Sequence, residues 1–139
     1  MILLDTHVLI WVLHDNEPKR LGSQTRALIA DAMQSGNLAV CAITPWEIAM
    51  LVEKGRLSFG IDVTDWLKTA LDPTCIKLLP IEPDIAVDSV NLPNYLYKDP
   101  ADRLIIATAR HAGAKLLTAD QKILDYGAAG YLDVFNVSK

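Results

Sequence analysis

Short apolar runs alternate along this 139-residue chain with longer segments that mix apolar and polar positions. The runs are too short for helices and predict strands at 1–4, 38–43, 76–81, 115–118 and 132–137, the first of them buried. The segments between them carry helix-start signals or helical spacing and predict helices at 6–14, 23–36, 44–55, 62–71, 83–91, 99–113 and 120–126. A polar break at 16–20 and a loop at 92–98 complete the pattern.

This alternation of strands and helices favours parallel pairing with right-handed crossovers. We therefore predict an α/β fold, a three-layer α/β/α arrangement around a central, mostly parallel sheet. Residues 1–139 are expected to form one domain, because the length suits a single core and no linker or repeat interrupts the pattern.

Four acidic residues come at or shortly after the ends of apolar runs, where helices should begin. They are Asp5, Glu47, Asp102 and Asp120, and each is expected to follow a different strand. In an α/β fold these points lie along the carboxyl edge of the sheet, where such folds bind ligands. Carboxylates gathered there repel one another, so they need protons or a hard cation. The pattern predicts a metal-dependent acidic site.

Each acid also has a purely structural explanation. Asp5 and Asp120 could cap the helices that follow them. Glu47 could complete a capping box with Thr44, and Asp102 could sit in a first helical turn, where the macrodipole favours negative charge. On this alternative the protein is a non-catalytic binding module.

Oxygen ligands without nearby cysteine suit Mg²⁺ or Mn²⁺ rather than zinc. The chemistry that needs such a cluster is phosphoryl or phosphodiester transfer. The hydroxyls of Thr6 and Thr118 could orient ligands or water, although local hydrogen bonding at a helix start is an equal alternative. The three histidines, His7, His14 and His111, are interpreted as surface or core residues rather than ligands.

Charge and cysteine content narrow the class of protein. A formal net charge of −4 argues against tight, sequence-independent duplex binding by charge alone. Two distant cysteines, Cys41 and Cys75, suit a reducing compartment, and Cys41 is expected to be buried. No signal peptide and no membrane-spanning run is recognised, so a cytoplasmic protein without membrane association is expected.

Four motifs together resemble the PIN-domain nucleases, and more closely the VapC-type toxins of bacterial type II toxin–antitoxin pairs. They are Leu3-Leu-Asp-Thr-His-Val-Leu-Ile-Trp, Thr44-Pro-Trp-Glu-Ile-Ala with the later Lys54-Gly-Arg-Leu, Lys98-Asp-Pro-Ala-Asp-Arg-Leu-Ile-Ile-Ala-Thr-Ala, and Leu116-Leu-Thr-Ala-Asp. The resemblance covers essentially the whole chain. It implies a PIN-like fold with a Rossmann-like core and an endoribonuclease dependent on Mg²⁺ or Mn²⁺, in which metal-activated water hydrolyses RNA phosphodiester bonds.

The resemblance also implies roles for particular residues. Asp5, Glu47, Asp102 and Asp120 match the metal-site acids of the family, which tolerates changes at the fourth acid. Asp99 is a rival to Asp102, and is interpreted as an N-cap or supporting group that Arg103 could pair with. Contacts with the RNA backbone are open to Lys98, Arg103 and Lys122, each of which could equally be a solvated surface charge.

By the same resemblance the protein forms a homodimer and is blocked by a small antitoxin whose tail lies across the acidic site. Three tryptophans, Trp11, Trp46 and Trp66, either supply apolar surface for such contacts or belong to the core.

Other enzymes also place acids at strand ends. A phosphatase of the haloacid type would want an Asp-x-Asp pair, but His7 occupies the second position. A receiver domain would want an aspartate closing the central strand, where this chain has Glu82-Pro83 after the third run. A non-toxin PIN-like nuclease is a further alternative.

Overall fold

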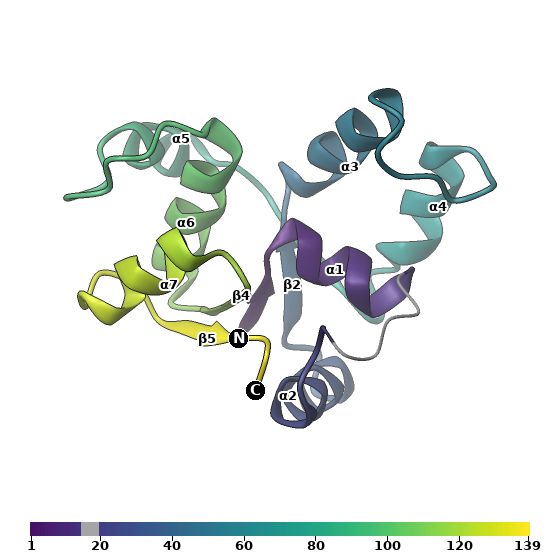
Figure 1. Cartoon of the computed structure of the whole chain (residues 1–139), viewed down its shortest axis with the longest axis horizontal. Helices are drawn as coiled ribbons and strands as arrows, with labels where there is room; N and C mark the ends of the chain where they lie inside the picture. The colour runs from purple at the N-terminus through teal and green to yellow at the C-terminus, as the bar shows by residue number, and fades with distance from the viewer. Residues whose placement is uncertain (15–19) are drawn as a thin grey trace.

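The strands of the computed structural model form one parallel sheet (Figure 1). The model describes residues 1–14 and 20–139, so the polar break expected at 16–20 lies, apart from Arg20, outside the described residues. In the described part the sheet is five-stranded, with the order β3-β2-β1-β4-β5 and every pairing parallel. The strands are β1 (Ile2–Leu4), β2 (Leu38–Cys41), β3 (Lys77–Leu79), β4 (Lys115–Thr118) and β5 (Val134–Asn136).

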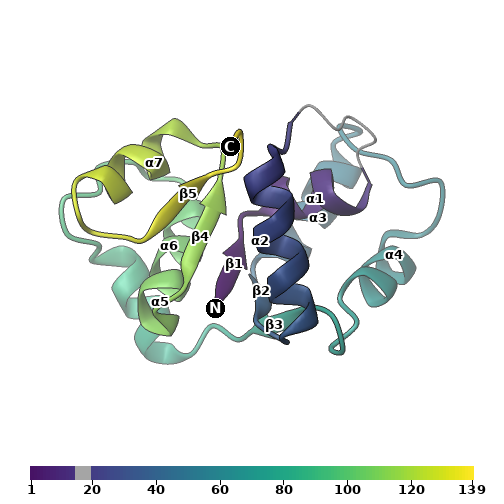
Figure 2. The same ribbon diagram turned by 90° about the horizontal axis from the view of Figure 1, so that it is seen from below.

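Helices cover both faces of this sheet, which confirms the predicted three-layer α/β/α fold. The helices are α1 (Thr6–Leu13), α2 (Ser23–Gln34), α3 (Thr44–Glu53), α4 (Val63–Ala70), α5 (Pro83–Val90), α6 (Pro100–Ala112) and α7 (Gln121–Ala128). Figure 1 shows α5, α6 and α7 on one side of the sheet and α1, α3 and α4 on the other. Figure 2 shows α2 lying along the sheet beside β1 and β2, on the same side as α1.

The core is divided between the two faces of the sheet. Leu3 of β1 packs into a cluster with residues of α5, α6 and α7, whereas Leu4 packs into a cluster with residues of α1, α2 and α3. Leu116 and Leu117 of β4 divide in the same way. Strands that are buried on both faces read as continuous apolar runs, which is why the sequence pattern located them. Cys41 is fully buried, as expected.

The central position of β1 determines where its end lies. Leu4 is in register with Val40 of β2 and with Leu117 of β4, so the next residue, Asp5, emerges at the carboxyl edge between two neighbouring strands. The expectation that Asp102 follows a strand is wrong, because α6 is preceded by α5 and a loop at 91–99. Helix α6 still begins at the carboxyl edge, because a helix that leads into a parallel strand must start there.

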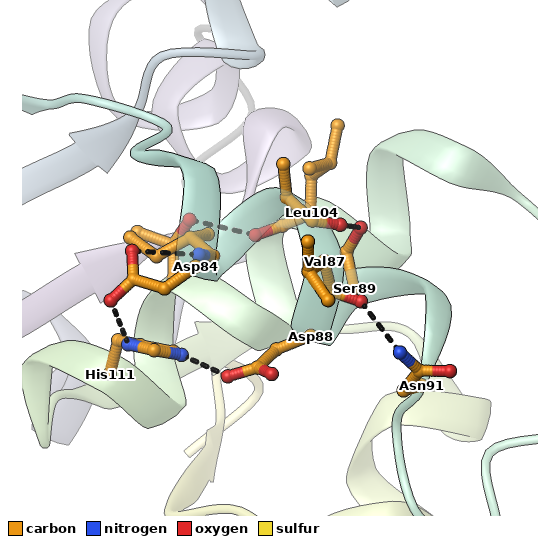
Figure 3. Close-up of polar contacts among 10 residues, drawn as sticks. Asp84, Val87, Asp88, Ser89, Asn91, Leu104 and His111 are labelled. Carbon is orange, nitrogen blue, oxygen red and sulfur yellow. Dashed lines mark hydrogen bonds and ion pairs between the residues drawn. The ribbon is translucent and has the colours of Figure 1, made fainter.

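Two carboxylates hold α6 against α5 (Figure 3). His111, near the end of α6, bonds through Nε2 to Asp88 and lies 3.7 Å from Asp84 through Nδ1. Both aspartates belong to α5, so this histidine has a structural role between the two helices.

Among the described residues, no helix combines the length and apolar character needed to cross a membrane.

Gly127 lies inside α7, whereas the helix predicted from the sequence ended just before it, at 126. The helix packs so closely on β5 that an added Cβ would come 2.1 Å from Cγ2 of Val134. The glycine is therefore required by packing and not by a helix stop.

We expect Gly127→Ala to destabilise the protein by up to about 2 kcal/mol. The clash with Val134 costs ~1–3 kcal/mol, which outweighs the ~1 kcal/mol that alanine gains in helix propensity. Urea denaturation measures the change. In a Val134→Ala background the same substitution should cost clearly less, and an equal cost in both backgrounds would contradict the packing argument.

Candidate functional site

Asp5 lies at the centre of the carboxyl edge and is only 7% exposed. Its backbone N–H donates to the carbonyl of Leu117, which extends the pairing of β1 with β4 by one residue (3.1 Å). Its carboxylate accepts from the Thr6 backbone N–H (2.8 Å) and from the Thr118 hydroxyl (2.7 Å). Burial raises the pKa of the Asp5 carboxyl above its usual value, against these two hydrogen bonds, which lower it.

Glu47 joins the same site through a chain of hydroxyl groups. The Thr6 hydroxyl donates to Oε1 of Glu47 (2.5 Å) and lies 2.9 Å from the hydroxyl of Thr44. A hydroxyl has one proton to donate, so Thr44 must donate to Thr6, which donates to Glu47. Burial also raises the pKa of Glu47, and the negative charges of Asp5 and Asp99 raise it further.

The predicted capping box in α3 is wrong. Ile43 is the N-cap residue and has no side-chain cap hydrogen bond, while Thr44 is already the first helical residue. The Glu47 carboxylate points to Thr6 of α1 instead of back to its own helix start. Helix capping therefore does not account for the glutamate at this position.

Asp102 occupies the first turn of α6 and is half-buried. Its pKa is raised to about 7, mainly by burial and then by the negative charges of four other acids: Asp99, Asp5, Asp120 and Glu47. A carboxyl responds to charges only where they are near it. The five acids consequently share one region of negative charge at the carboxyl edge.

Asp99 and Asp120 have clear structural duties as well. Asp99 is the N-cap of α6 and accepts from the backbone N–H of Asp102 (3.0 Å). Asp120 is the N-cap of α7 and accepts from the backbone N–H of Lys122 (2.9 Å), whose ammonium group lies 3.7 Å from its other oxygen. These two acids fit the capping alternative, and so does Asp5, which is the N-cap of α1 and accepts from the Thr6 backbone N–H. Glu47 does not, because its carboxylate is held by the hydroxyl of Thr6.

The expected pairing of Arg103 with Asp99 does not occur. The Arg103 guanidinium donates to three carbonyl oxygens, those of Tyr97 (2.7 Å), Tyr95 (2.7 Å) and Ser89 (3.1 Å). Its donors are thus used to hold the 91–99 loop and the end of α5 against α6. Arg103 is a structural brace, and its interpretation as an RNA contact is not supported by this geometry.

The Tyr95 hydroxyl is a feature of this region that the sequence pattern did not indicate. Tyr95 is 4% exposed, and its hydroxyl has no hydrogen-bond partner among the described residues. Burial raises its pKa, and the negative charges of Asp102 and Asp120 raise it further, so the hydroxyl keeps its proton. It is a buried donor near the acids. No periodicity could have identified it, because Tyr95 lies in an irregular loop.

A pocket of about 380 Å³ opens beside the acids, between the starts of α3 and α6. Glu47 and Asp99 line its acidic end, and Trp46 and His7 contribute to its wall. The described side chains, as they lie, do not bring three His, Cys, Asp or Glu groups within reach of one ion. The donor set itself suits a hard cation, because it consists of carboxylate and hydroxyl oxygens.

Known proteins resemble this chain over nearly its whole length. A family model described as PIN domain matches residues 2–129. The chain is 38% identical over 122 residues to Ribonuclease VapC22 of Mycobacterium tuberculosis (strain ATCC 25618 / H37Rv), with 88% of each chain covered. Similar solved structures include a toxin–antitoxin complex from Klebsiella pneumoniae, with TM-score 0.64, 25% identity and coverage of 98% and 97%.

Two further structures share the fold at 24% identity. FitAB bound to an IR36 DNA fragment has a TM-score of 0.68, with 100% of this chain and 96% of that chain covered. FitAcB from Neisseria gonorrhoeae has a TM-score of 0.67, with 98% and 97% covered.

The raised pKa of Asp102 predicts that wild type loses more stability than Asp102→Asn when the pH is raised from 5 to 8 in EDTA. A carboxyl with a higher pKa in the folded state binds more protons there, so its stabilising effect is lost as pH rises from about 4 to about 7. Each pKa unit corresponds to ~1.4 kcal/mol. Because Asp102 is only half-buried, solvent screening reduces the total, and we expect about 1–2 kcal/mol.

Urea denaturation at both pH values measures this difference. Asp31→Asn, at an exposed position on α2 away from the acids, is the control. It should have the same free energy of unfolding as the wild type at both pH values. A difference between wild type and Asp102→Asn that stays constant from pH 5 to pH 8 would contradict the interpretation.

Proposed function

The chain belongs to the PIN-domain family and is VapC-like, and we propose that it is a metal-dependent endoribonuclease that hydrolyses RNA phosphodiester bonds. The observation that carries the proposal is the Asp5 carboxylate, buried at the end of the central strand and electrostatically coupled to Asp102 and Glu47. The relative named Ribonuclease VapC22, at 38% identity, supports RNA as the substrate.

Three acids, Asp5, Glu47 and Asp102, would hold Mg²⁺ or Mn²⁺, and Asp120 would complete the site. To bind one cation together, these side chains would have to rotate toward one another. Rotation is enough, because all of them lie at the same edge of the sheet. Such an ion lowers the pKa of water and neutralises charge on phosphate oxygens. A cation would also offset the mutual repulsion that contributes to the raised pKa values of Glu47 and Asp102.

The threonines have positioning roles in this proposal. Thr118 fixes one oxygen of Asp5, which leaves the orientation of that carboxylate defined. Thr6 fixes Glu47 and is itself oriented by Thr44. Hydrogen bonds of this kind orient ligands and influence metal affinity by ~10- to 100-fold.

We propose that the protein acts as the toxin of a type II pair and is inhibited by a cognate antitoxin. The similarity to a toxin–antitoxin complex from Klebsiella pneumoniae supports this partner. A short reading frame immediately upstream should encode a protein that copurifies with this one and suppresses RNA cleavage. A neighbouring product that leaves cleavage unchanged would argue against the pairing.

A homodimer is the second proposed assembly. Four large apolar side chains are exposed on α5 and the following loop: Val87 (59%), Val90 (74%), Leu96 (84%) and Tyr97 (50%). We call these four residues the α5 apolar surface. Arg103 ties the end of α5 to the loop that carries Leu96 and Tyr97, which keeps the two segments together. Exposed apolar surface of this kind marks interaction sites.

The nuclease activity is tested on a mixed pool of tRNA, rRNA and mRNA. Wild-type protein should cleave RNA with Mg²⁺ or Mn²⁺ and stop when EDTA is added. Asp5→Asn and Asp102→Asn should each lose activity by about a hundredfold or more, because each removes a proposed ligand. Thr118→Val, which removes only the hydrogen bond to Asp5, should lose ~10- to 100-fold.

Asp31→Asn is the control for this series and should retain wild-type cleavage. Circular dichroism establishes that each variant is folded. Folded wild-type protein that leaves RNA intact with both metals would overturn the proposal, as would cleavage by Asp5→Asn at the wild-type rate.

Dimerisation is tested by Val90→Asp, which places a charge in the α5 apolar surface. Light scattering at micromolar concentration should give the mass of two chains for wild type and of one chain for the variant, since a buried unpaired charge is costly. Ile61→Asp is the matched control, because Ile61 is also exposed (59%) but lies outside this surface. A wild-type protein with the mass of one chain would contradict the proposal.

A further inference from the structure

Trp46 is unusually exposed for its size. It is 57% exposed in the first turn of α3, immediately before Glu47 in sequence. Trp11 and Trp66, by comparison, are partly buried and pack against the core cluster that Leu4 forms with residues of α1, α2 and α3. The chain therefore leaves one large aromatic surface in water directly beside a proposed metal ligand.

This tryptophan lines the pocket of about 380 Å³ described above, which is within the ~300–1,000 Å³ range of ligand-binding clefts. Met50 continues the apolar wall along α3, and Pro100 and Ala101 form the opposite wall at the start of α6. Both helices begin at the carboxyl edge of the sheet (Figure 1), so the pocket opens next to the acids.

The wall of the pocket near the end of α3 is cationic. Lys54 and Arg56 line it, both are exposed, and neither makes an ion pair with another described residue. Between them Gly55 has φ +69°, and the Arg56 N–H donates to the carbonyl of Leu51 (2.9 Å), so the chain turns back toward α3. The pocket consequently has carboxylates and an exposed aromatic side chain at the start of α3, and two cations that have no ion pair among the described residues at its end.

That combination of groups suits a single RNA strand. A phosphate at the acidic end, approached through a divalent cation, would be followed by a base on the aromatic face and a second phosphate at the cations. Exposed aromatic rings stack unpaired bases, and lysine and arginine hold the backbone. A base inside a duplex is already stacked, so the arrangement selects single-stranded RNA.

We propose that Trp46, Lys54 and Arg56 form a nucleotide subsite that stacks the base adjoining the scissile phosphate and holds the next phosphate. The subsite rests on the proposed ribonuclease function and specifies how its substrate is held. A peptide segment of a protein partner is the rival occupant. RNA is favoured because two cations without an ion pair among the described residues line the same pocket as the aromatic face, in a protein of net charge −4.

The test compares Trp46→Ala and Trp46→Phe on a short single-stranded RNA that spans a cleavage site mapped with the wild type. Stacking contributes ~1–3 kcal/mol per base, so Trp46→Ala should raise KM about tenfold or more, with a smaller effect on kcat. Trp46→Phe keeps an aromatic face and should recover most of the loss. Ile61→Ala, of similar exposure but outside this pocket, is the control.

A second substrate makes the assignment specific. In an RNA whose nucleotide beside the cleaved bond is abasic, wild type and Trp46→Ala should have nearly the same KM, because no base is left to stack. Lys54→Ala and Arg56→Ala should each reduce the dependence of RNA affinity on salt, measured in the Asp102→Asn background so that the RNA stays intact.

The outcomes separate the two proposals. If wild type cleaves RNA and Trp46→Ala has an unchanged KM, the subsite is wrong and the ribonuclease function stands. An equal loss on normal and abasic RNA would also overturn the subsite, because it would show that Trp46 acts only by positioning Glu47. Weakened binding of a protein inhibitor with unchanged KM for RNA would assign the pocket to a peptide. Absence of RNA cleavage by wild type would overturn both proposals.

Discussion

The buried carboxylate of Asp5 is the constraint on which the rest of the site depends. A negative charge at the end of the central strand is costly to bury unless hydrogen-bond donors surround it. The backbone N–H of Thr6 and the hydroxyl of Thr118 supply two donors, one from α1 and one from β4. Because Thr6 also bonds to Glu47, the same network connects β1, β4, α1 and α3. The sheet edge thereby becomes a single polar unit.

Repulsion within that unit gives the site its chemical character. Asp102 illustrates it, since burial and four neighbouring acids raise its pKa to about 7. Asp99 and Asp120 contribute negative charge while also capping helices, so their structural and functional roles coexist. Arg103, whose charge could have neutralised part of the cluster, is directed instead to the carbonyls of the 91–99 loop. The excess negative charge therefore remains at the sheet edge, where it favours the binding of a cation.

Charge is distributed unevenly around the pocket next to these acids. Glu47 and Trp46 line it at the start of α3, Asp99 lines it at the start of α6, and Lys54 and Arg56 line it at the end of α3. A protein with net charge −4 can bind a polyanion only if lysine and arginine side chains are concentrated locally and the charge of the acids is neutralised by a metal ion. The α5 apolar surface, which includes Val90, belongs to the opposite side of the sheet from α3, so the proposed dimer contact and the pocket involve different helices.

The sequence by itself determined the layered fold and the placement of Asp5 and Glu47 after neighbouring strands, because buried parallel strands are apolar throughout and helices lead away from one sheet edge. It also marked Asp102 as part of a helix start, although that helix follows a loop and not a strand. Only the tertiary structure decided what depends on partners distant in sequence. It turned Glu47 from its own helix start toward Thr6, placed Gly127 against Val134, and committed Arg103 to loop carbonyls. It also left the Tyr95 hydroxyl buried near the acids. Periodicity and capping signals report local geometry, whereas side-chain direction is determined by contacts made across the fold.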